Sequence, residues 1–386
     1  MRVCGIVAEY DPFHKGHYYQ LEEAKQNSSA DYIICVISTA FTQRGMPGLL
    51  STRDRAEMAL LAGADLVLGM PVSYSCSQAN RFAMGGVGIL QALGVVSHLS
   101  FGIEKESLPH LFQIRDLLLN PSIAYKKALQ ESLSQGQSFA RAQGNAIANY
   151  FSNADNTTIN QPNFNLALCY LQAISILNSS IEPMPVIRQG HYHDTKITAL
   201  PSASAVRAAI LRGDWPSVEA ALPLCSFQIV KAAAEKNHFH LPDALDKALL
   251  SLLAREKDYS EVLEMSEGLD LRMLNYSREA RSRTELIELI KTKRYPYARI
   301  SRAISQSLIG IKKQPLAPPA YARLLGFRKR ASPLLQAIGK NHFPLISRPA
   351  KSSDPNLKID MYAEQLWHIG SNQASADAYR QKLIII

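Results

Sequence analysis

The chain has 386 residues, 47% of them hydrophobic, a length that predicts about two domains with apolar cores. It contains no run of about 18 apolar residues, which excludes an ordinary membrane span, and its N-terminal segment turns polar too soon for a signal peptide. The five cysteines form no Cys-x-x-Cys pair, so we expect reduced thiols, no dedicated metal site and a cytoplasmic protein.

Positive charge is concentrated in the C-terminal part of the chain. Residues 270–351 contain 18 lysine and arginine residues and 4 aspartate and glutamate residues, a local net charge of +14 against +9 for the whole chain. No acidic residue occurs between Leu289 and Ser353. Such a region is typical of a surface that binds a polyanion such as a nucleic acid. The alternative is a solvated basic face without a ligand.

Short apolar runs alternate with helical patterns over about the first 105 residues. The alternation indicates βαβ units and predicts an α/β fold with a Rossmann-like, doubly wound parallel sheet. We expect strands at Val3–Ala8, Tyr32–Ser38, Asp65–Met70 and Ser97–Phe101, and helices at His17–Gln26, Arg53–Ala62 and Ser77–Leu93.

The remaining segments are expected to be mainly helical. A helical insertion spans about residues 109–180, and a short strand at Met184–Arg188 returns to the sheet. Further helices are expected at Ser202–Arg212, Glu285–Thr292 and Ile300–Leu308, with a loop at Pro315–Pro319 and a packed apolar end at Leu383–Ile386. We therefore divide the chain into an α/β domain, residues 1–215, and a basic, mainly helical region, residues 216–386.

The most informative motif directly follows the first expected strand. A turn at Asp11-Pro12 leads to His14-x-Gly16-His17 at the start of a helix. Two imidazoles three residues apart can donate to one phosphate group, and the helix N-terminus adds free N–H groups. Donors at this point stabilise the charge that grows when an oxyanion attacks the α-phosphate of ATP. The motif predicts nucleotidyl transfer with His14 and His17 as catalytic residues; the alternative is a turn with two incidental histidines.

A second phosphate-binding element is expected at the start of the later helix. Ser202 and Ser204 supply hydroxyl groups, the helix supplies free amides, and Arg207 supplies positive charge. Together they could hold the β- and γ-phosphates of ATP. The alternative is an ordinary capped helix start.

Several segments together resemble the tRNA(Met) cytidine acetate ligases, bacterial nucleotidyltransferase-like proteins with an HxGH motif. The matching segments run from Met1 to about Arg330: Gly5–His17, Gln43–Pro47, Arg55–Leu60, Gly63–Val67, Leu99–Gly102, Pro162-Asn163, Arg188, Tyr192–Asp194, Ser202–Arg207 and Glu285–Tyr295. The chain departs from the family pattern at Thr52-Arg53, where a Lys-Trp pair is common, and at Phe164 and Ala167. Arg53 or Lys15 could replace the missing charge.

The resemblance implies a two-step reaction. ATP activates acetate as acetyl-adenylate, and the acetyl group then passes to the exocyclic amine of the wobble cytidine of elongator tRNA(Met). It also implies ATP contacts, to which Ser202, Ser204 and Arg207 are added: Val7, Ala8, Glu9, Tyr10, Asp11, Pro12, Phe13, His14, Lys15, Gly16, His17, Tyr18, Tyr19, Gln20, Gly102, Asn163 and Arg188. By themselves Gly102 could be a turn glycine, Asn163 a helix cap and Arg188 a surface charge. We expect Mg²⁺ to accompany ATP.

The expected tRNA contacts lie in the basic region. They are Lys291, Lys293, Arg294, Arg299 and Arg302, with Tyr295 and Tyr297 available to stack on unpaired bases and Arg323 and Arg328–Arg330 extending the patch. A wobble base must turn out of the anticodon loop to react, which suits such residues. The alternative is a set of solvated charges.

Two other functions fit parts of the sequence. A nucleotidyltransferase of coenzyme biosynthesis, acting on a small phosphorylated metabolite, would share the HxGH motif without needing the basic region. A non-catalytic RNA-binding protein would keep the basic region beside a vestigial ATP site. ATP–pyrophosphate exchange separates the enzymes from the second alternative, and its dependence on acetate separates the two enzymes. The sequence indicates no protein partner.

Overall fold

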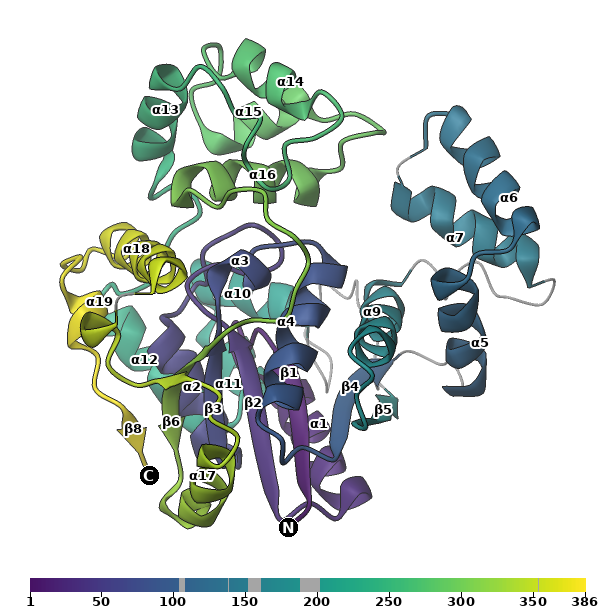
Figure 1. Cartoon of the computed structure of the whole chain (residues 1–386). Helices are drawn as coiled ribbons and strands as arrows, with labels where there is room; N and C mark the ends of the chain where they lie inside the picture. Colours follow the sequence, from purple (N-terminus) through teal and green to yellow (C-terminus); the bar gives the residue numbers. More distant parts are fainter. Residues whose placement is uncertain (104–107, 138, 152–160, 188–201, 353) are drawn as a thin grey trace.

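The structure is a computed structural model that describes residues 1–103, 108–137, 139–151, 161–187, 202–352 and 354–386. In these residues, eight strands form one mostly parallel sheet (Figure 1). The order is β5-β4-β1-β2-β3-β6-β7, and β8 pairs with β6. The first five strands are parallel: β1 (Val3–Ala8), β2 (Tyr32–Ser38), β3 (Leu66–Met70), β4 (His98–Ile103) and β5 (Glu182–Ile187). β6 (Ala322–Phe327) lies antiparallel to β3, whereas β7 (Leu345–Ile346) and β8 (Ile384–Ile385) lie parallel to β6.

Helices cover both faces of the sheet because each central strand is apolar on both sides. In β1, Val3 and Val7 face one core, whereas Cys4 and Ile6 face the other. The first core includes α4 (Ala79–Ala92) and α9 (Pro162–Ile176). The second core includes α1 (Lys15–Ser28), α2 (Thr52–Leu61), α10 (Ala203–Arg212), α11 (Trp215–Ala221) and α12 (Leu224–Glu235).

Two groups of helices extend beyond the sheet (Figure 1). α5 (Leu108–Leu119), α6 (Ile123–Ser134) and α7 (Phe139–Tyr150) stand to one side. α13 (Asp246–Arg255), α14 (Leu269–Tyr276), α15 (Arg283–Ile290) and α16 (Tyr297–Ile309), the upper helices, lie above the carboxyl ends of the parallel strands. Their core continues into α3 (Val72–Ser75) and α18 (Pro355–Gly370). The remaining elements are α17 (Ser332–Gly339), α19 (Asp377–Arg380) and the 3₁₀ helices η1 (Lys329–Ala331) and η2 (Pro349–Lys351). None of the described helices is long and apolar enough to cross a membrane.

The first half of the chain confirms the predicted elements. Each predicted strand and helix up to Leu93 is present, with ends displaced by at most three residues, and Ser202 caps α10. The apolar chain end also packs, with Ile384 buried in β8. By contrast, β6, β7 and β8 were not predicted, because residues 216–386 were expected to be mainly helical. The division into residues 1–215 and 216–386 stays a prediction, although these three strands of the second part extend the sheet of the first.

A buried ion pair explains how a strand with an arginine can join the sheet. In β6, the Arg323 guanidinium donates to the Glu364 carboxylate of α18 at 2.6 Å, and both side chains are buried. The Thr52 hydroxyl donates to the same carboxylate oxygen at 2.8 Å. The Arg323 charge is therefore satisfied only when α18 packs beside β6, which a local sequence pattern does not reveal.

Replacing Arg323 by methionine leaves the Glu364 carboxylate buried without its cation. We expect the free energy of unfolding, measured by urea titration, to fall by about 3–5 kcal/mol, the usual effect of removing one member of a buried pair. The control is Arg380→Met, which removes an exposed ion pair with Asp377 and should leave the unfolding midpoint nearly unchanged. Equal shifts in the two variants would contradict a structural role for the buried pair.

Candidate active site

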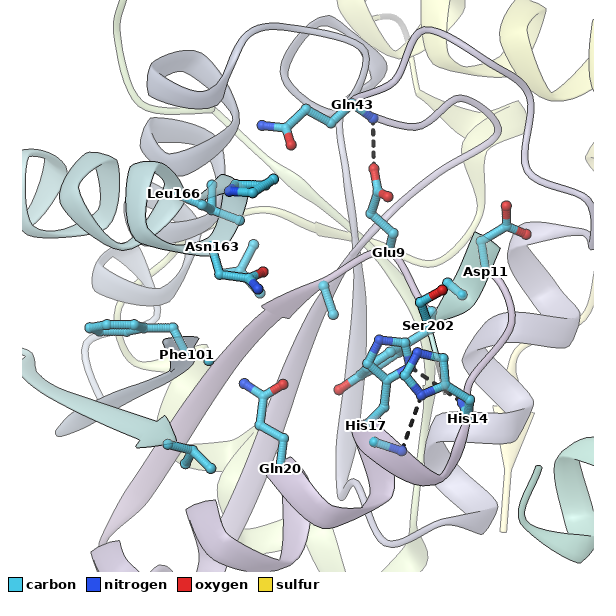
Figure 2. Close-up of a pocket in the computed structure, with 18 of the residues that line it drawn as sticks. Glu9, Asp11, His14, His17, Gln20, Gln43, Phe101, Asn163, Leu166 and Ser202 are labelled. Atoms are coloured by element: carbon cyan, nitrogen blue, oxygen red, sulfur yellow. Dashed lines mark hydrogen bonds between the residues drawn. The ribbon is translucent and has the colours of Figure 1, made fainter. Parts of the chain in front are cut away.

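A cavity of about 230 Å³ lies at the carboxyl ends of β1 and β4 and reaches the starts of α1, α9 and α10 (Figure 2). This edge of a parallel sheet is where α/β proteins bind ligands. Fifteen residues predicted to contact ATP line the cavity: Val7, Ala8, Glu9, Tyr10, Asp11, His14, Gly16, His17, Tyr19, Gln20, Gly102, Asn163, Ser202, Ser204 and Arg207. Segments about 200 residues apart in the sequence therefore meet at one site, as the motifs predict.

Four other predicted ATP contacts do not line this cavity. Phe13 is fully buried against Tyr10, with ring centroids 4.7 Å apart. The Lys15 ammonium group donates to the Ala220 carbonyl at 2.6 Å, and the Tyr18 side chain is exposed. Pro12 belongs to the turn and is likewise absent from the cavity wall. Arg188 and the Tyr192–Asp194 segment lie outside the described residues.

Ten further residues line the cavity and were not singled out as ATP contacts. They are Gln43, Arg44, Phe82, Phe101, Pro162, Leu166, Tyr170, Val186, Ile187 and Ala203. Gln43 and Arg44 belong to a segment that carried the family resemblance, so that segment was the available signal. Phe101, Pro162 and Ala203 also belong to such segments. The other apolar residues gave no signal, because an aromatic or aliphatic side chain at a strand end or on a helix is typical of an ordinary core.

The two motif histidines stack at the start of α1 (Figure 2). Their ring centroids are 3.7 Å apart and their planes differ by 19°. His14 Nδ1 accepts from the Gly16 amide at 3.1 Å, and His17 Nδ1 accepts from the His14 amide at 3.3 Å. In a neutral imidazole, an accepting Nδ1 leaves the proton on Nε2. The backbone of the turn therefore sets both rings as Nε2–H donors, the form needed to bind a phosphate oxygen.

Two arginines converge beside the start of α10. The Ser204 hydroxyl accepts from the Arg44 guanidinium at 2.9 Å and from that of Arg207 at 3.3 Å. Arg207 also donates to the Asp11 carbonyl at 2.6 Å. Ser202 caps the helix by accepting from the Ala205 amide. Hydroxyls, guanidinium groups and a helix N-terminus face one cavity, which is a favourable environment for phosphate.

Two carboxylates on the loop after β1 have different surroundings. Asp11 accepts from the Leu49 amide at 2.8 Å and lies 3.6 Å from the Arg207 guanidinium. Glu9 accepts from the Gln43 amide at 2.7 Å, and burial raises the pKa of its carboxyl group. Figure 2 shows Glu9 pointing toward Gln43 and Asp11 pointing away from the centre of the cavity. Both carboxylates line the cavity, but Asp11 also orders the neighbouring loop through its bond to the Leu49 amide.

The residues proposed to replace the missing family lysine are engaged elsewhere. Thr52, which stands where the family lysine is common, is buried, and its hydroxyl donates to Glu364. Arg53, one of the two proposed replacements, donates to the Lys382 carbonyl. Neither residue lines the cavity, and Lys15 is also outside it. Among the described residues, no three His, Cys, Asp or Glu side chains gather to hold a metal ion.

The predicted tRNA contacts differ in their exposure to solvent and in their ion-pair partners. Lys291, Lys293 and Arg294 are exposed on the segment between α15 and α16. Arg299 pairs with Glu267 at 2.6 Å, and Arg302 is mostly buried beside Glu264 at 2.5 Å. An exposed contact surface is therefore available at the first three residues, whereas Arg302 has an internal partner.

Three suggestions about the basic patch are wrong. Tyr295 is buried and donates to the Glu267 carbonyl, so it cannot stack on a base, whereas Tyr297 is exposed. Arg323 is buried in the sheet. Arg328 and Arg330 hydrogen-bond to Asp65 and the Leu60 carbonyl, and the Lys329 amide donates to the Ile386 carbonyl. This segment follows β6 near the start of β3, at the end of the sheet away from the upper helices (Figure 1). These residues do not extend a patch at α15 and α16.

Known proteins resemble the chain over nearly its whole length. The HIGH Nucleotidyl Transferase family model matches residues 1–382. The tRNA(Met) cytidine acetate ligase of Thermoanaerobacter sp. (strain X514) is 33% identical over 375 residues, covering 95% of this chain and 94% of that protein. That of Fervidobacterium nodosum is 36% identical over 360 residues, covering 90% and 84%.

Solved structures agree with these sequence relationships. The crystal structure of Thermotoga maritima TmcAL bound with alpha-thio ATP covers 100% of both chains at 28% identity, with a TM-score of 0.89. The apo form of the same protein has a TM-score of 0.90 at the same identity and coverage. The chain therefore belongs to the tRNA(Met) cytidine acetate ligases, enzymes of the HIGH nucleotidyl transferase type.

Proposed function

We propose that this enzyme activates acetate with ATP and transfers the acetyl group to the wobble cytidine of elongator tRNA(Met), forming N-acetylcytidine. The observation that carries the proposal is the pair of stacked histidines, His14 and His17, both set as donors toward a cavity that α10 also faces. The names of the relatives and the ATP analogue bound to the Thermotoga maritima protein support ATP and tRNA as substrates.

In the first step, an acetate oxygen attacks the α-phosphorus of ATP and the bond to pyrophosphate breaks. Negative charge then grows on the oxygens of the α-phosphate and on the leaving group. We assign His14 and His17 to the α-phosphate and Ser202, Ser204 and Arg207 to the β- and γ-phosphates. Phe101 and Asn163 lie on the opposite side of the cavity and, with Gly102 of the same strand end as Phe101, provide an apolar and amide surface for adenine. Mg²⁺ would accompany the phosphates as it does in most ATP enzymes.

In the second step, the amine of the cytidine takes the acetyl group and AMP leaves. The exposed Lys291, Lys293 and Arg294 lie beside the upper helices, above the edge of the sheet where the cavity opens. Their charge can hold the phosphates of an anticodon stem-loop, and Tyr297 is available for a base.

The decisive experiment follows labelled acetate. Purified protein, ATP and a tRNA(Met) transcript should yield label in the RNA, and the label should be absent without ATP. ATP–pyrophosphate exchange that needs no acetate would favour the coenzyme-type nucleotidyltransferase. RNA binding without any exchange would favour the non-catalytic alternative.

The variant His14→Asn separates the role of His14 as the N-cap of α1 from its proposed role in catalysis. Asparagine is a good N-cap residue, so α1 and the unfolding midpoint should be preserved. The variant lacks the Nε2 donor, and we expect acetate-dependent ATP–pyrophosphate exchange to fall about 10²–10³-fold, as for other lost transition-state donors. Wild-type exchange in this variant would refute the assignment.

His17→Ala tests the division of labour between the two parts of the chain. We expect it to abolish adenylylation while tRNA affinity, measured by filter binding, stays close to that of the wild type. An equal loss of adenylylation and of tRNA affinity would contradict the division of these roles between the two parts of the chain.

Reversing the charge of the exposed basic segment tests the RNA surface. Lys293→Glu with Arg294→Glu should weaken tRNA binding, most strongly at low salt, because fewer counterions are released on binding. Acetate-dependent exchange should continue. The control is Lys340→Glu with Lys358→Glu, two exposed positions outside the upper helices. Unchanged tRNA affinity at low salt would sink the assignment.

A further inference from the structure

A second cavity, of about 130 Å³, lies beside the first and shares a wall with it. Glu9, Asp11, Arg44 and Arg207 line both cavities. The second cavity is much smaller than the roughly 300–1,000 Å³ of sites for drug-sized ligands, so it suits a small planar group rather than a whole nucleotide. A group bound there would lie next to phosphates held in the first cavity.

The other walls of the second cavity are mainly apolar. The apolar residues come from the loop after β2, from α10 and from the segment before α13: Met46, Pro47, Leu49, Leu211 and Pro242. Thr42 also lines the cavity, and its hydroxyl donates to the Met46 carbonyl at 3.1 Å. His240 also lines it, and burial lowers the pKa of that imidazole to about 4, so it is uncharged near pH 7. A flat ring can pack its faces against such uncharged walls. The charged residues lie on one side of the cavity, in the wall that it shares with the first.

The polar wall contains one carboxylate oxygen that is not engaged. Both Asp11 oxygens have partners, since one accepts from the Leu49 amide and the other faces Arg207. Glu9 Oε1 accepts from the Gln43 amide, but no donor among the described residues hydrogen-bonds to Oε2. Glu9 is therefore the carboxylate that can accept a hydrogen bond from a ligand in either cavity.

The second cavity lies near the upper helices. Its wall includes Leu211 and Arg44, both exposed on the surface. The loop that carries Arg44 packs on α16, where the neighbouring Gly45 lies so close to Ser301 and Arg302 that a side chain would overlap their backbone. An RNA held at the basic segment before α16 would be adjacent to this loop.

We propose that the second cavity receives the ring of the acyl acceptor, an aminopyrimidine turned out of an RNA loop, and that Glu9 accepts the proton of its exocyclic amine. This inference rests on the proposed function, because it supplies the acceptor site for the same acetyl transfer. It adds a binding site and a catalytic residue for the second step.

The chemistry of the step is balanced within the site. The amine nitrogen attacks the acetyl carbonyl carbon and a C–N bond forms. The bond from that carbon to the AMP oxygen breaks, and its electron pair stays on the phosphate. The amine proton passes to Glu9, which later releases it to water. Arg207 and Arg44 lie in the shared wall, where they face the negative charge that develops on AMP.

The surroundings of Glu9 suit a proton acceptor. Burial raises the pKa of its carboxyl group and Asp11 adds to the increase, whereas the Gln43 amide, Arg44 and Arg207 lower it. Arg55 binds the Glu9 carbonyl at 2.8 Å, and Tyr170 faces the same cavity. A carboxylate whose pKa lies above its ordinary value is a more effective base near neutral pH.

Leu211→Phe tests the acceptor cavity without touching the wall shared with the first. The larger ring should fill the cavity, and we expect acetyl transfer to tRNA to fall about 10²-fold, as for misplaced reactants, while acetate-dependent exchange continues. Leu224→Phe is the matched control, because Leu224 is exposed and lines neither cavity. Wild-type transfer by Leu211→Phe would overturn the proposal. An increased KM for acetate in the exchange would also overturn it, by assigning the cavity to acetate.

Glu9→Gln tests the proton acceptor with acetyl-adenylate supplied directly, so that adenylylation is bypassed. In the wild type, the single-turnover rate of transfer should fall as the pH drops through the raised pKa of Glu9, because the protonated acid cannot accept a proton. In the Glu9→Gln variant, the rate should not show this fall with pH, and acetyl transfer should be about 10²-fold slower. If the transfer rate of the variant depended on pH as that of the wild type does, the role of Glu9 would be refuted. Absence of labelled RNA with the wild-type enzyme would instead reject the proposed function itself.

Discussion

The geometry of the site depends on the hydrogen bonds that the buried guanidinium of Arg55 donates. It donates to the carbonyls of Glu9, Ser38 and Thr39, which follow or end β1 and β2, and to that of Leu50. A fully buried cation is stable only when such acceptors surround it. By holding these carbonyls, Arg55 sets the direction in which both loops leave the sheet, and those loops carry the histidines, the carboxylates and Arg44.

The loop after β2 connects the cavity to the upper helices. Its Gln43 amide binds Glu9, while its Gln43 carbonyl accepts from Arg302 of α16. Gly45 adopts a φ of +72°, a conformation that glycine tolerates without strain, and its carbonyl accepts from the buried Arg283. One short segment thus contacts both the cavity wall and the helices beside the exposed basic residues. Arg302 serves this connection, which accounts for its small exposure.

The charged side chains of the site differ in their hydrogen-bond and ion-pair partners, and these partners decide what each group can do. The two arginines beside Ser204 are stabilised by hydroxyl and carbonyl oxygens and still face the cavity. Asp11 is neutralised by Arg207 and backbone amides, so it serves the loop. Glu9 has a single amide partner among the described residues and keeps a raised pKa. Two carboxylates two residues apart therefore have different chemistry because their hydrogen-bond partners differ.

The sequence by itself determined the elements and motifs whose causes are local. Apolar runs buried on both faces predicted β1 to β4, a serine cap marked the start of α10, and the His14-x-Gly16-His17 motif predicted a nucleotide site at the start of α1. Only the tertiary structure decided that β6 joins the sheet, that Arg302 and Arg323 face internal carboxylates, and that Tyr295 is buried. It also decided that residues from the loops after β1 and β2, from α10 and from the segment before α13 enclose a second cavity. The physical reason is that burial and ion pairing depend on partners far away in the sequence, such as Glu364 for Arg323, whereas strand periodicity and helix capping depend on near neighbours.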